Sequence, residues 1–286
     1  MNLWLILSIN SVTLGGLLFL LSAGFSLIFG LMRIPNLTHG SMFMLGAYLG
    51  VSFIGWGFGF WGAALAAGLG VALFGGVVER FVLRRLAGAE LAQVLVTLGL
   101  SFMVADACLM LWGGDPISVE TPHALRGTTA VLGVAFSTYR LAIILVAMVI
   151  AAGLSGLLDR TRLGAMIRAA VDDPAMARVV GIRVSFLFTI VFSLGAGLAG
   201  FAGVIGAPIL SVYPGLDQDM LPLALVVVIL GGTGSLLGSL VGSFVVGFLY
   251  NFGQAMFPEL AYVILFLPML VVLVIRPQGL FGRTVM

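Results

Sequence analysis

Residues 3–32 read LWLILSINSVTLGGLLFLLSAGFSLIFGLM and contain no charged side chain. About 20 mostly apolar residues cross the hydrocarbon core of a bilayer as an α-helix, so this run is long enough to span it. Eight more apolar segments follow, near residues 38–55, 60–79, 94–113, 139–158, 187–210, 220–232, 237–252 and 258–276. We therefore expect an all-α polytopic transmembrane bundle of about eight or nine spans, formed by residues 1–286 as a single domain. The short segments 220–232 and 237–252 are either a tight hairpin or two partly spanning helices.

The composition agrees with a membrane protein and excludes several kinds of enzyme. Hydrophobic residues make up 61% of the chain and charged residues 8%, whereas soluble domains carry about 25% charged residues. All 13 basic residues are arginine, so neither a phosphate-binding loop that ends in lysine nor a lysine Schiff base can form. The single cysteine, Cys108, excludes an intramolecular disulfide and a metal site built from cysteines. We expect no enzyme activity, cofactor or metal site, and if ATP drives this protein, another chain must hydrolyse it.

The arginines indicate the orientation in the membrane. When successive segments alternate direction, one side receives Arg33, Arg80, Arg84, Arg85, Arg160, Arg162, Arg168, Arg178, Arg183, Arg276 and Arg283. The other side keeps Arg126 and Arg140, together with the acidic residues Asp115, Glu120, Asp217, Asp219 and Glu259. Because arginines are enriched on the cytoplasmic side, we expect the N-terminus outside and the C-terminus in the cytoplasm. In the external loop, residues 114–138, the β-branched stretch 128–138 predicts a small hairpin, either a passive lid or a docking point for an external partner.

The cytoplasmic loop, residues 159–185, is the most informative soluble stretch. Its apolar residues Leu163, Met166, Ile167, Ala170 and Val171 recur at helical spacing, which predicts an amphipathic helix. A second, short helix is expected from Pro174 to Val180, because Asp173 is a good N-cap, proline suits the first position and Gly181 can end the helix. This short helix is either a solvated connector between two spans or a surface that fits a partner's groove.

A few polar residues lie inside or beside the apolar segments. A carboxylate at Asp106 in the fourth segment costs about 2.5–3.5 kcal/mol in a membrane, so we expect it to face the bundle interior or to be protonated. It is either a proton relay or a hydrogen-bonded packing residue. Asn36 and His39 follow the first segment at an expected helix break, where they either line the transport path or belong to a cytoplasmic turn. Glu79 precedes Arg80 at a segment end and is expected to pair with it locally.

Four patches of sequence resemble the permease subunits of branched-chain amino acid ABC importers. They are Gly30–Gly40 with Met44–Tyr48, the loop pattern Arg162-x-Gly164-x-x-x-Arg168-Ala169-Ala170 with Asp173, Ala177, Gly181 and Ile182, the run Gly231–Ser235 with Gly238, and the tail Arg276–Gly282. The patches are spread over nearly the whole chain in the order of the family. Pro35 and Thr38 depart from the more usual residues, a second Leu or Ile and Ala, and they could bear on substrate choice.

The resemblance implies a permease that works by alternating access in a bacterial cytoplasmic membrane. In such importers a coupling helix docks in a groove of the ATPase, and this role falls here on Asp173, Pro174, Ala175, Ala177, Arg178 and Gly181. The implied partners are two ATP-binding cassette ATPase subunits, a second homologous permease subunit, an extracytoplasmic substrate-binding protein and membrane lipid, without nucleic acid. The implied cargo is a branched-chain or similar hydrophobic amino acid, although urea, amides and aromatic acids fit the same pattern. The rival classes are a proton-coupled secondary transporter that uses Asp106 and a passive channel.

A short internal echo suggests an inverted repeat. Leu21-Ser22-Ala23-Gly24 opens a glycine-rich run that we expect to break at Pro35, and Leu194-Gly195-Ala196-Gly197 opens one that we expect to break at Pro208. The two runs are expected to cross the membrane in opposite directions, as an inverted repeat requires. The path would then lie near Asn36, His39, Gly197 and Pro208.

Overall fold

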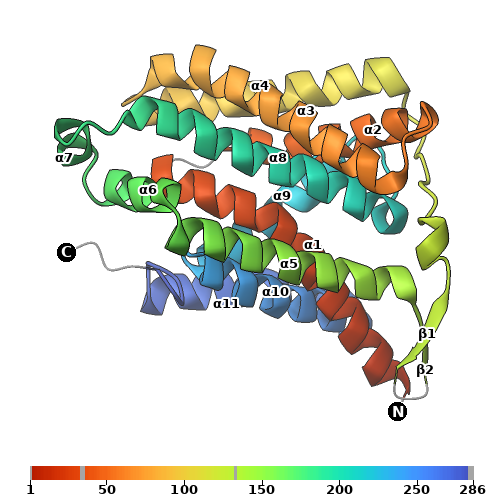
Figure 1. The fold of residues 1–286 in the computed structure, drawn as a ribbon. Coiled ribbons are helices and arrows are strands. Elements are labelled where there is room, and N and C mark those ends of the chain that lie inside the picture. The colour runs from red at the N-terminus through yellow and green to blue at the C-terminus, as the bar shows by residue number, and fades with distance from the viewer. Residues whose placement is uncertain (1, 33–35, 132–133, 283–286) are drawn as a thin grey trace.

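Nine long helices make up most of residues 2–32, 36–131 and 134–282, which are the parts of the chain described by the computed structural model (Figure 1). They are α1 (Asn2–Met32), α2 (Thr38–Gly55), α3 (Phe60–Phe81), α4 (Glu90–Trp112), α5 (Thr138–Arg160), α8 (Val184–Leu210), α9 (Leu216–Gly231), α10 (Leu236–Met256) and α11 (Ala261–Ile275). The shorter elements are η1 (Leu83–Leu86), η2 (His123–Leu125), β1 (Thr128–Val131), β2 (Val134–Ser137), α6 (Arg162–Asp172), α7 (Pro174–Val179) and η3 (Pro258–Leu260).

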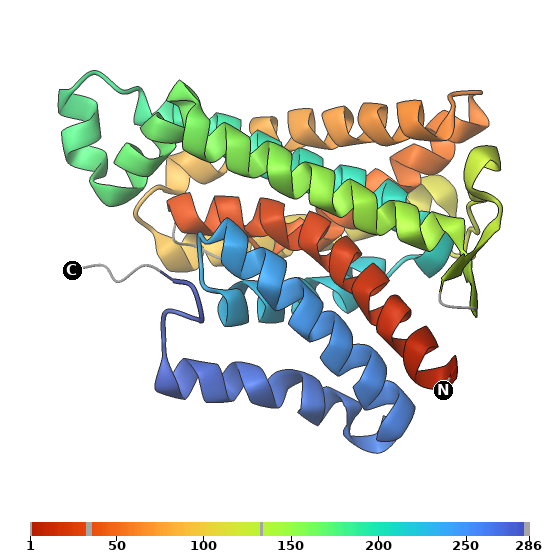
Figure 2. The ribbon, with the colours of Figure 1, turned by 60° about the horizontal axis from the view of Figure 1, so that its bottom comes forward.

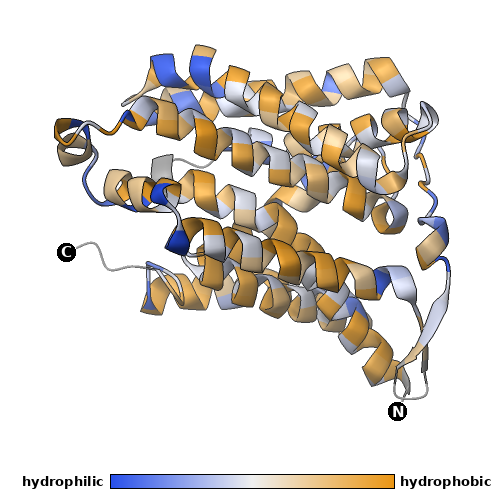
Figure 3. Ribbon diagram, in the orientation of Figure 1, coloured by the Kyte–Doolittle hydropathy of each residue, from blue (hydrophilic) through white to orange (hydrophobic). Residues whose placement is uncertain are grey.

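The nine long helices correspond one to one with the nine apolar segments, so the all-α membrane fold is confirmed. Within the described residues, seven helical stretches are long and apolar enough to cross a membrane, namely Leu3–Gly30, Phe60–Leu86, Glu90–Trp112, Thr138–Arg160, Val184–Leu210, Leu236–Met256 and Pro258–Ile275. The helices α2 and α9, with 18 and 16 residues, are not among the seven. Both open with polar residues and are largely buried, so other helices rather than lipid surround them. Figure 3 shows hydrophobic residues along the helices and hydrophilic ones gathered toward their ends.

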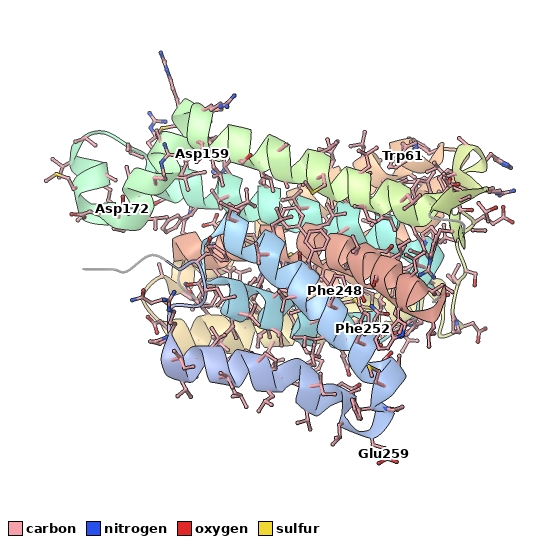
Figure 4. The ribbon with its side chains drawn as sticks, turned by 90° about the horizontal axis from the view of Figure 1, so that it is seen from below. Trp61, Asp159, Asp172, Phe248, Phe252 and Glu259 are labelled. Carbon is pink, nitrogen blue, oxygen red and sulfur yellow. The ribbon has the colours of Figure 1, made fainter. Side chains whose placement is uncertain are left out.

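The helices α1 and α8 form the centre of the bundle. Residues 15–26 of α1 are buried without interruption, as expected for a helix that is apolar on all sides. α8 packs against α1, α2 and α3, while α1 also packs against α5 and α10 (Figure 2). Near the N-terminus of α1, Trp4 contacts Phe252 of α10, whose ring stacks on Phe248 (Figure 4).

Glycines allow the central helices to approach closely. A Cβ atom added at Gly195 of α8 would lie 2.7 Å from the backbone oxygen of Gly24 in α1, and one added at Gly203 would overlap the backbone oxygen of Phe43 in α2. In a bilayer, where the hydrophobic effect does not drive helices together, such small residues permit the backbone contact that stabilises a bundle. This explains the use of glycine at these two crossings.

The packing of the first four helices is repeated by the last four. α3 packs on α8 as α10 packs on α1, and α2 packs on α3 as α9 packs on α10. Likewise α2 contacts α4, α9 contacts α11, and the pairs α1 with α8 and α2 with α9 also touch. Exchanging α1–α4 with α8–α11 therefore preserves the pattern of neighbours.

The two ends of the bundle differ. At one end lie α6, α7 and the end of α11, and at the other lie the start of α1 and the β1–β2 hairpin (Figure 1). The predicted hairpin is confirmed, since β1 and β2 are antiparallel with Thr128 opposite Ser137 and Val131 opposite Val134. Its connection, Leu132 and Gly133, lies outside the described residues. The same loop is fixed to the end of α8 by a backbone bridge between Ile117 and Val212, with N–O distances of 2.8 and 2.9 Å.

Candidate functional site

The connection between α5 and α8 is held against the bundle by α6. The Thr161 hydroxyl caps this helix by accepting a hydrogen bond from the Gly164 amide at 3.2 Å. Gly164 lies so close to the end of α5 that an added Cβ would overlap the Leu158 carbonyl. The predicted amphipathic helix is confirmed at Ile167 and Ala170, which are buried, whereas Met166, which was expected on the same apolar face, is exposed. α6 is therefore a fixed support for the segment that follows.

The short helix α7 is closed at both ends by its own residues. The Asp173 carboxylate accepts hydrogen bonds from the Ala175 and Met176 amides, both at 2.9 Å, and Pro174 occupies the first helical position. At the other end Gly181 adopts a φ of +88°, in the left-handed region that glycine tolerates best. The Ile182 amide then bonds the Ala177 carbonyl at 2.9 Å. The predicted capped helix is confirmed, and it ends one residue earlier than expected, at Val179.

α7 turns different residues inward and outward. Ala177 is only 3% exposed and packs with Ile167, Ala170 and Val184 of the neighbouring helices. Three larger apolar side chains face outward, since Met176 is 58% exposed, Val179 81% and Val180 68%. Ala175, Arg178 and Gly181 are exposed as well. Ala177 thus positions α7 on the bundle, and Met176, which the sequence did not single out, belongs to the outward surface. We call Met176, Val179 and Val180 the apolar tip.

A polar region lies inside the bundle where α2 begins. His39 is fully buried, and its Nε2 lies 2.9 Å from the Leu21 backbone oxygen in α1. Leu21 is about 16 Å along α1 from its end at Met32, by the helical rise per residue. Asn36 is 3% exposed, and its Oδ1 accepts a hydrogen bond from the Thr38 amide at 3.1 Å. α2 therefore starts deep in the bundle rather than at its surface. Pro35 lies outside the described residues.

The start of α9 meets the start of α2. A Cβ added at Gly40 would lie 2.7 Å from the Asp217 backbone oxygen. The Asp217 side chain is buried, 5% exposed, and its Oδ2 lies 3.5 Å from the Ser101 hydroxyl near the middle of α4. Placing Asp217 in an external loop was therefore wrong, because α9 begins four residues before the apolar segment that predicted it. The turn residues Pro214 and Gly215 were the signal for this earlier start.

Gly197 and Pro208 do not join this polar region. A Cβ at Gly197 would lie 3.1 Å from the Gly68 backbone oxygen in α3, so this glycine serves the α3–α8 crossing. Pro208 lies in the last turn of α8, which ends at Leu210. α8 thus stops close to the predicted break, and only Asn36 and His39 of the four path candidates come together.

Asp106 does not face the bundle interior as expected. It is exposed on the outward side of α4, whereas Cys108, two residues on, is fully buried. Glu79 does not pair with Arg80 either, because its carboxylate lies 3.4 Å from the Arg84 guanidinium. In the part of the chain that the structure describes, no three His, Cys, Asp or Glu side chains are placed to hold a metal ion.

Comparison with known proteins gives one family along almost the whole chain. The family described as "Branched-chain amino acid transport system / permease component" matches residues 7–273. The chain is 28% identical to the high-affinity branched-chain amino acid transport system permease protein BraD of Pseudomonas aeruginosa, over 96% of this chain and 94% of that protein. It is 25% identical to the corresponding permease protein LivH of Escherichia coli K12, with the same two coverages.

A shorter match is to a differently named importer. The autoinducer 2 import system permease protein LsrC of Klebsiella pneumoniae is 30% identical over 53% of this chain and 44% of that protein. No solved structure matches the chain significantly.

Proposed function

The chain belongs to the permease components of branched-chain amino acid transport systems, the membrane-spanning part of bacterial ABC importers, and we propose that it moves branched-chain or similar hydrophobic amino acids across the cytoplasmic membrane by alternating access. Membership of this family makes the chain the permease and not the ATPase, and it implies ATPase and binding-protein partners in general. Membership of this family also argues against the rival hypothesis, a proton-coupled secondary transporter with Asp106 as its proton relay.

The apolar tip is the observation that carries the proposed mechanism. Met176, Val179 and Val180 are exposed, and they lie outside the seven stretches that are long and apolar enough to cross a membrane. α7 is held rigidly by Asp173 and Gly181, and it stands at the end of the bundle (Figure 1). A short helix that presents apolar side chains is the shape that a partner's groove accepts. We assign this groove to the ATPase, with one ATPase subunit on this chain and another on a second, homologous permease.

The arginines support an orientation with α7 in the cytoplasm. Figure 4 shows Asp159 and Asp172 toward the end that carries α6 and α7, and Trp61 and Glu259 toward the opposite one. Three arginines, Arg84, Arg160 and Arg178, lie at or beside the end of the bundle that carries α7. Arg33 and Arg283 fall outside the described residues. By the positive-inside rule, the N-terminus and the β1–β2 hairpin face the binding protein outside.

The interlocking of both halves supports a single permease domain over residues 1–286. α1 lies between α8 and α10, so neither half of the chain can bury its central helix alone. The pattern of neighbouring helices stays the same when α1–α4 are exchanged with α8–α11, and this supports an inverted repeat. The transport path would then follow the starts of α2 and α9, beside Asn36 and His39. Gly197 and Pro208 would contribute only through the position of α8.

The cargo is tested by uptake into proteoliposomes that contain the complex purified from its native host. With the binding protein and ATP, we expect uptake of leucine, isoleucine or valine and no uptake without ATP. The relatives BraD and LivH, which match almost the full length, favour this cargo. Uptake of autoinducer 2, which the shorter match to LsrC makes the second candidate, with none of these amino acids, would overturn the proposed cargo.

A further inference from the structure

One link between α7 and the spans passes through the first turns of α8. Residues 180–183 join the two helices, and Ala177 of α7 packs with Val184 at the start of α8, so a displacement of α7 is passed directly to α8. Two residues near the start of α8, Ser185 and Thr189, lie one turn apart and are directed toward the end of α3. The structure places a charged cluster at this point.

This cluster consists of Glu79 from α3, Arg84 from η1 and Thr189 from α8. The Thr189 hydroxyl lies 2.5 Å from Glu79 Oε2 and 2.6 Å from Arg84 Nη2, so it donates to the carboxylate and accepts from the guanidinium. Arg84 Nη2 also donates to the Ser185 carbonyl at 2.5 Å. We call Glu79, Arg84 and Thr189 the polar clamp.

The clamp is more than a surface ion pair. The Glu79 side chain is 1% exposed while that of Arg84 is 36% exposed. An exposed ion pair contributes little, but a buried carboxylate that loses its partners is costly. α8 therefore cannot slide along α3 at this end without taking the Thr189 hydrogen bond away from the buried Glu79 carboxylate.

η1 carries the connection onward to α4. The Leu83 carbonyl, one residue before Arg84, accepts a hydrogen bond from Gln93 Nε2 at 3.1 Å. Gln93 is 4% exposed and lies in the first turn of α4. Arg84 thus holds η1 to α8, and its neighbour Leu83 holds η1 to α4.

One turn after Gln93, α4 reaches the buried start of α2. The Thr97 hydroxyl accepts a hydrogen bond from the Leu37 amide at 3.3 Å, and the Thr97 carbonyl accepts one from the Thr38 hydroxyl at 2.8 Å. A further turn along α4, Ser101 lies beside Asp217 at the start of α9. Side-chain hydrogen bonds, the chain bond between Leu83 and Arg84 and the turns of α4 therefore connect the first turns of α8 with the place where α2 and α9 meet.

We propose that the polar clamp makes α8 and η1 move as one unit, and that Gln93 and Thr97 pass this movement through α4 to the start of α2. Glu79, Arg84, Thr189 and Gln93 are then positioning residues for transport. They act through the helices that they join and do not touch the cargo. This inference rests on the proposed function, because it assumes that α7 receives the movement of an ATPase. A physical series of contacts is the kind of network through which distant sites are coupled.

The test is the substitution Thr189→Val in the complete complex, reconstituted with its ATPase and binding protein. Valine preserves the shape of threonine and removes the hydroxyl that joins α8 to the clamp. We expect uptake per ATP hydrolysed to fall about tenfold, the size of effect that loss of a hydrogen bond to a charged group produces. ATPase binding should stay near that of the wild type, and the melting temperature should fall only by the cost of this one hydrogen bond. Thr189→Ser, which restores the hydroxyl, should recover coupling.

A matched control is Thr13→Val. The Thr13 hydroxyl donates to the Ile9 carbonyl of its own helix α1 at 2.8 Å, and α1 contributes no residue to the clamp. If Thr189→Val is unstable, Gln93→Met interrupts the same series in α4 and should lower uptake per ATP in the same way. A Thr189→Val complex that couples as well as Thr13→Val would overturn the clamp and leave the proposed function standing. A wild-type complex that takes up cargo without ATP hydrolysis would overturn both.

Discussion

Val179→Ala tests whether the apolar tip is buried by a partner. Val179 is 81% exposed in the isolated chain, so nearly its whole side chain is free to be covered. The substitution removes two carbon atoms, and burial contributes about 0.8 kcal/mol for each, which gives about 1.6 kcal/mol or a loss of affinity of about 15-fold. The folded chain loses almost no buried surface, so its melting temperature should not change.

The assay is a titration of labelled ATPase onto the permease in lipid nanodiscs. Val77→Ala is the matched control, because Val77 is also exposed, at 51%, but lies on the membrane-spanning part of α3. It should leave the affinity for the ATPase unchanged. Equal affinities of the wild type and Val179→Ala would refute the assignment of the apolar tip to the ATPase, as would a loss equally large in Val77→Ala.

Two further predictions concern packing and capping. Gly203→Ala places a Cβ against the Phe43 backbone oxygen and should destabilise the bundle by about 1–3 kcal/mol, seen as a lower melting temperature in detergent; Gly99→Ala, with no atom within 4 Å of the added Cβ, should not, and equal melting temperatures would contradict the close α2–α8 contact. Asp173→Ala removes the cap of α7, which is worth about 0.5–2 kcal/mol. It should weaken ATPase binding with the bundle intact, and an unchanged affinity would show that α7 does not need its cap to dock.

The membrane fold could be predicted from the sequence because hydrophobic length and the positions of charges determine it. Segment 3–32 became α1, and the glycines of the α1–α8 crossing were already noted as part of a repeated pattern. The caps of α7 could also be predicted, since Asp173, Pro174 and Gly181 act on their immediate neighbours. These features depend on local sequence.

The buried polar residues could not be predicted in the same way. Asp217 resembles a loop residue because charged residues usually end a span, yet α9 begins inside the bundle, where α2 and α4 surround its first turn. Asp106 resembles a buried carboxylate because it lies within an apolar segment, yet the side of α4 that it occupies is decided by packing against α2. Burial of these groups depends on helices distant in the sequence.

Which residues of α7 face inward could not be predicted from the sequence either. A helix of six residues is too short for an apolar stripe to show, so Ala177 and Val179 looked alike. The start of α8 decides between them, because Val184 and its neighbours cover Ala177 and leave Val179 outside. The clamp residues Glu79 and Thr189 are 110 positions apart, and no spacing rule joins them.

Cross-linking from the apolar tip tests the central claim most directly. Cys108 is buried, so Val179→Cys adds an accessible thiol that can carry a photoactivatable cross-linker in the complex purified from its native host. We expect a single product whose mass is that of this chain plus an ATPase subunit, and no such product from Val77→Cys on the membrane face. A complex that contains no ATPase, or an ATPase that cross-links equally well from position 77, would contradict the account.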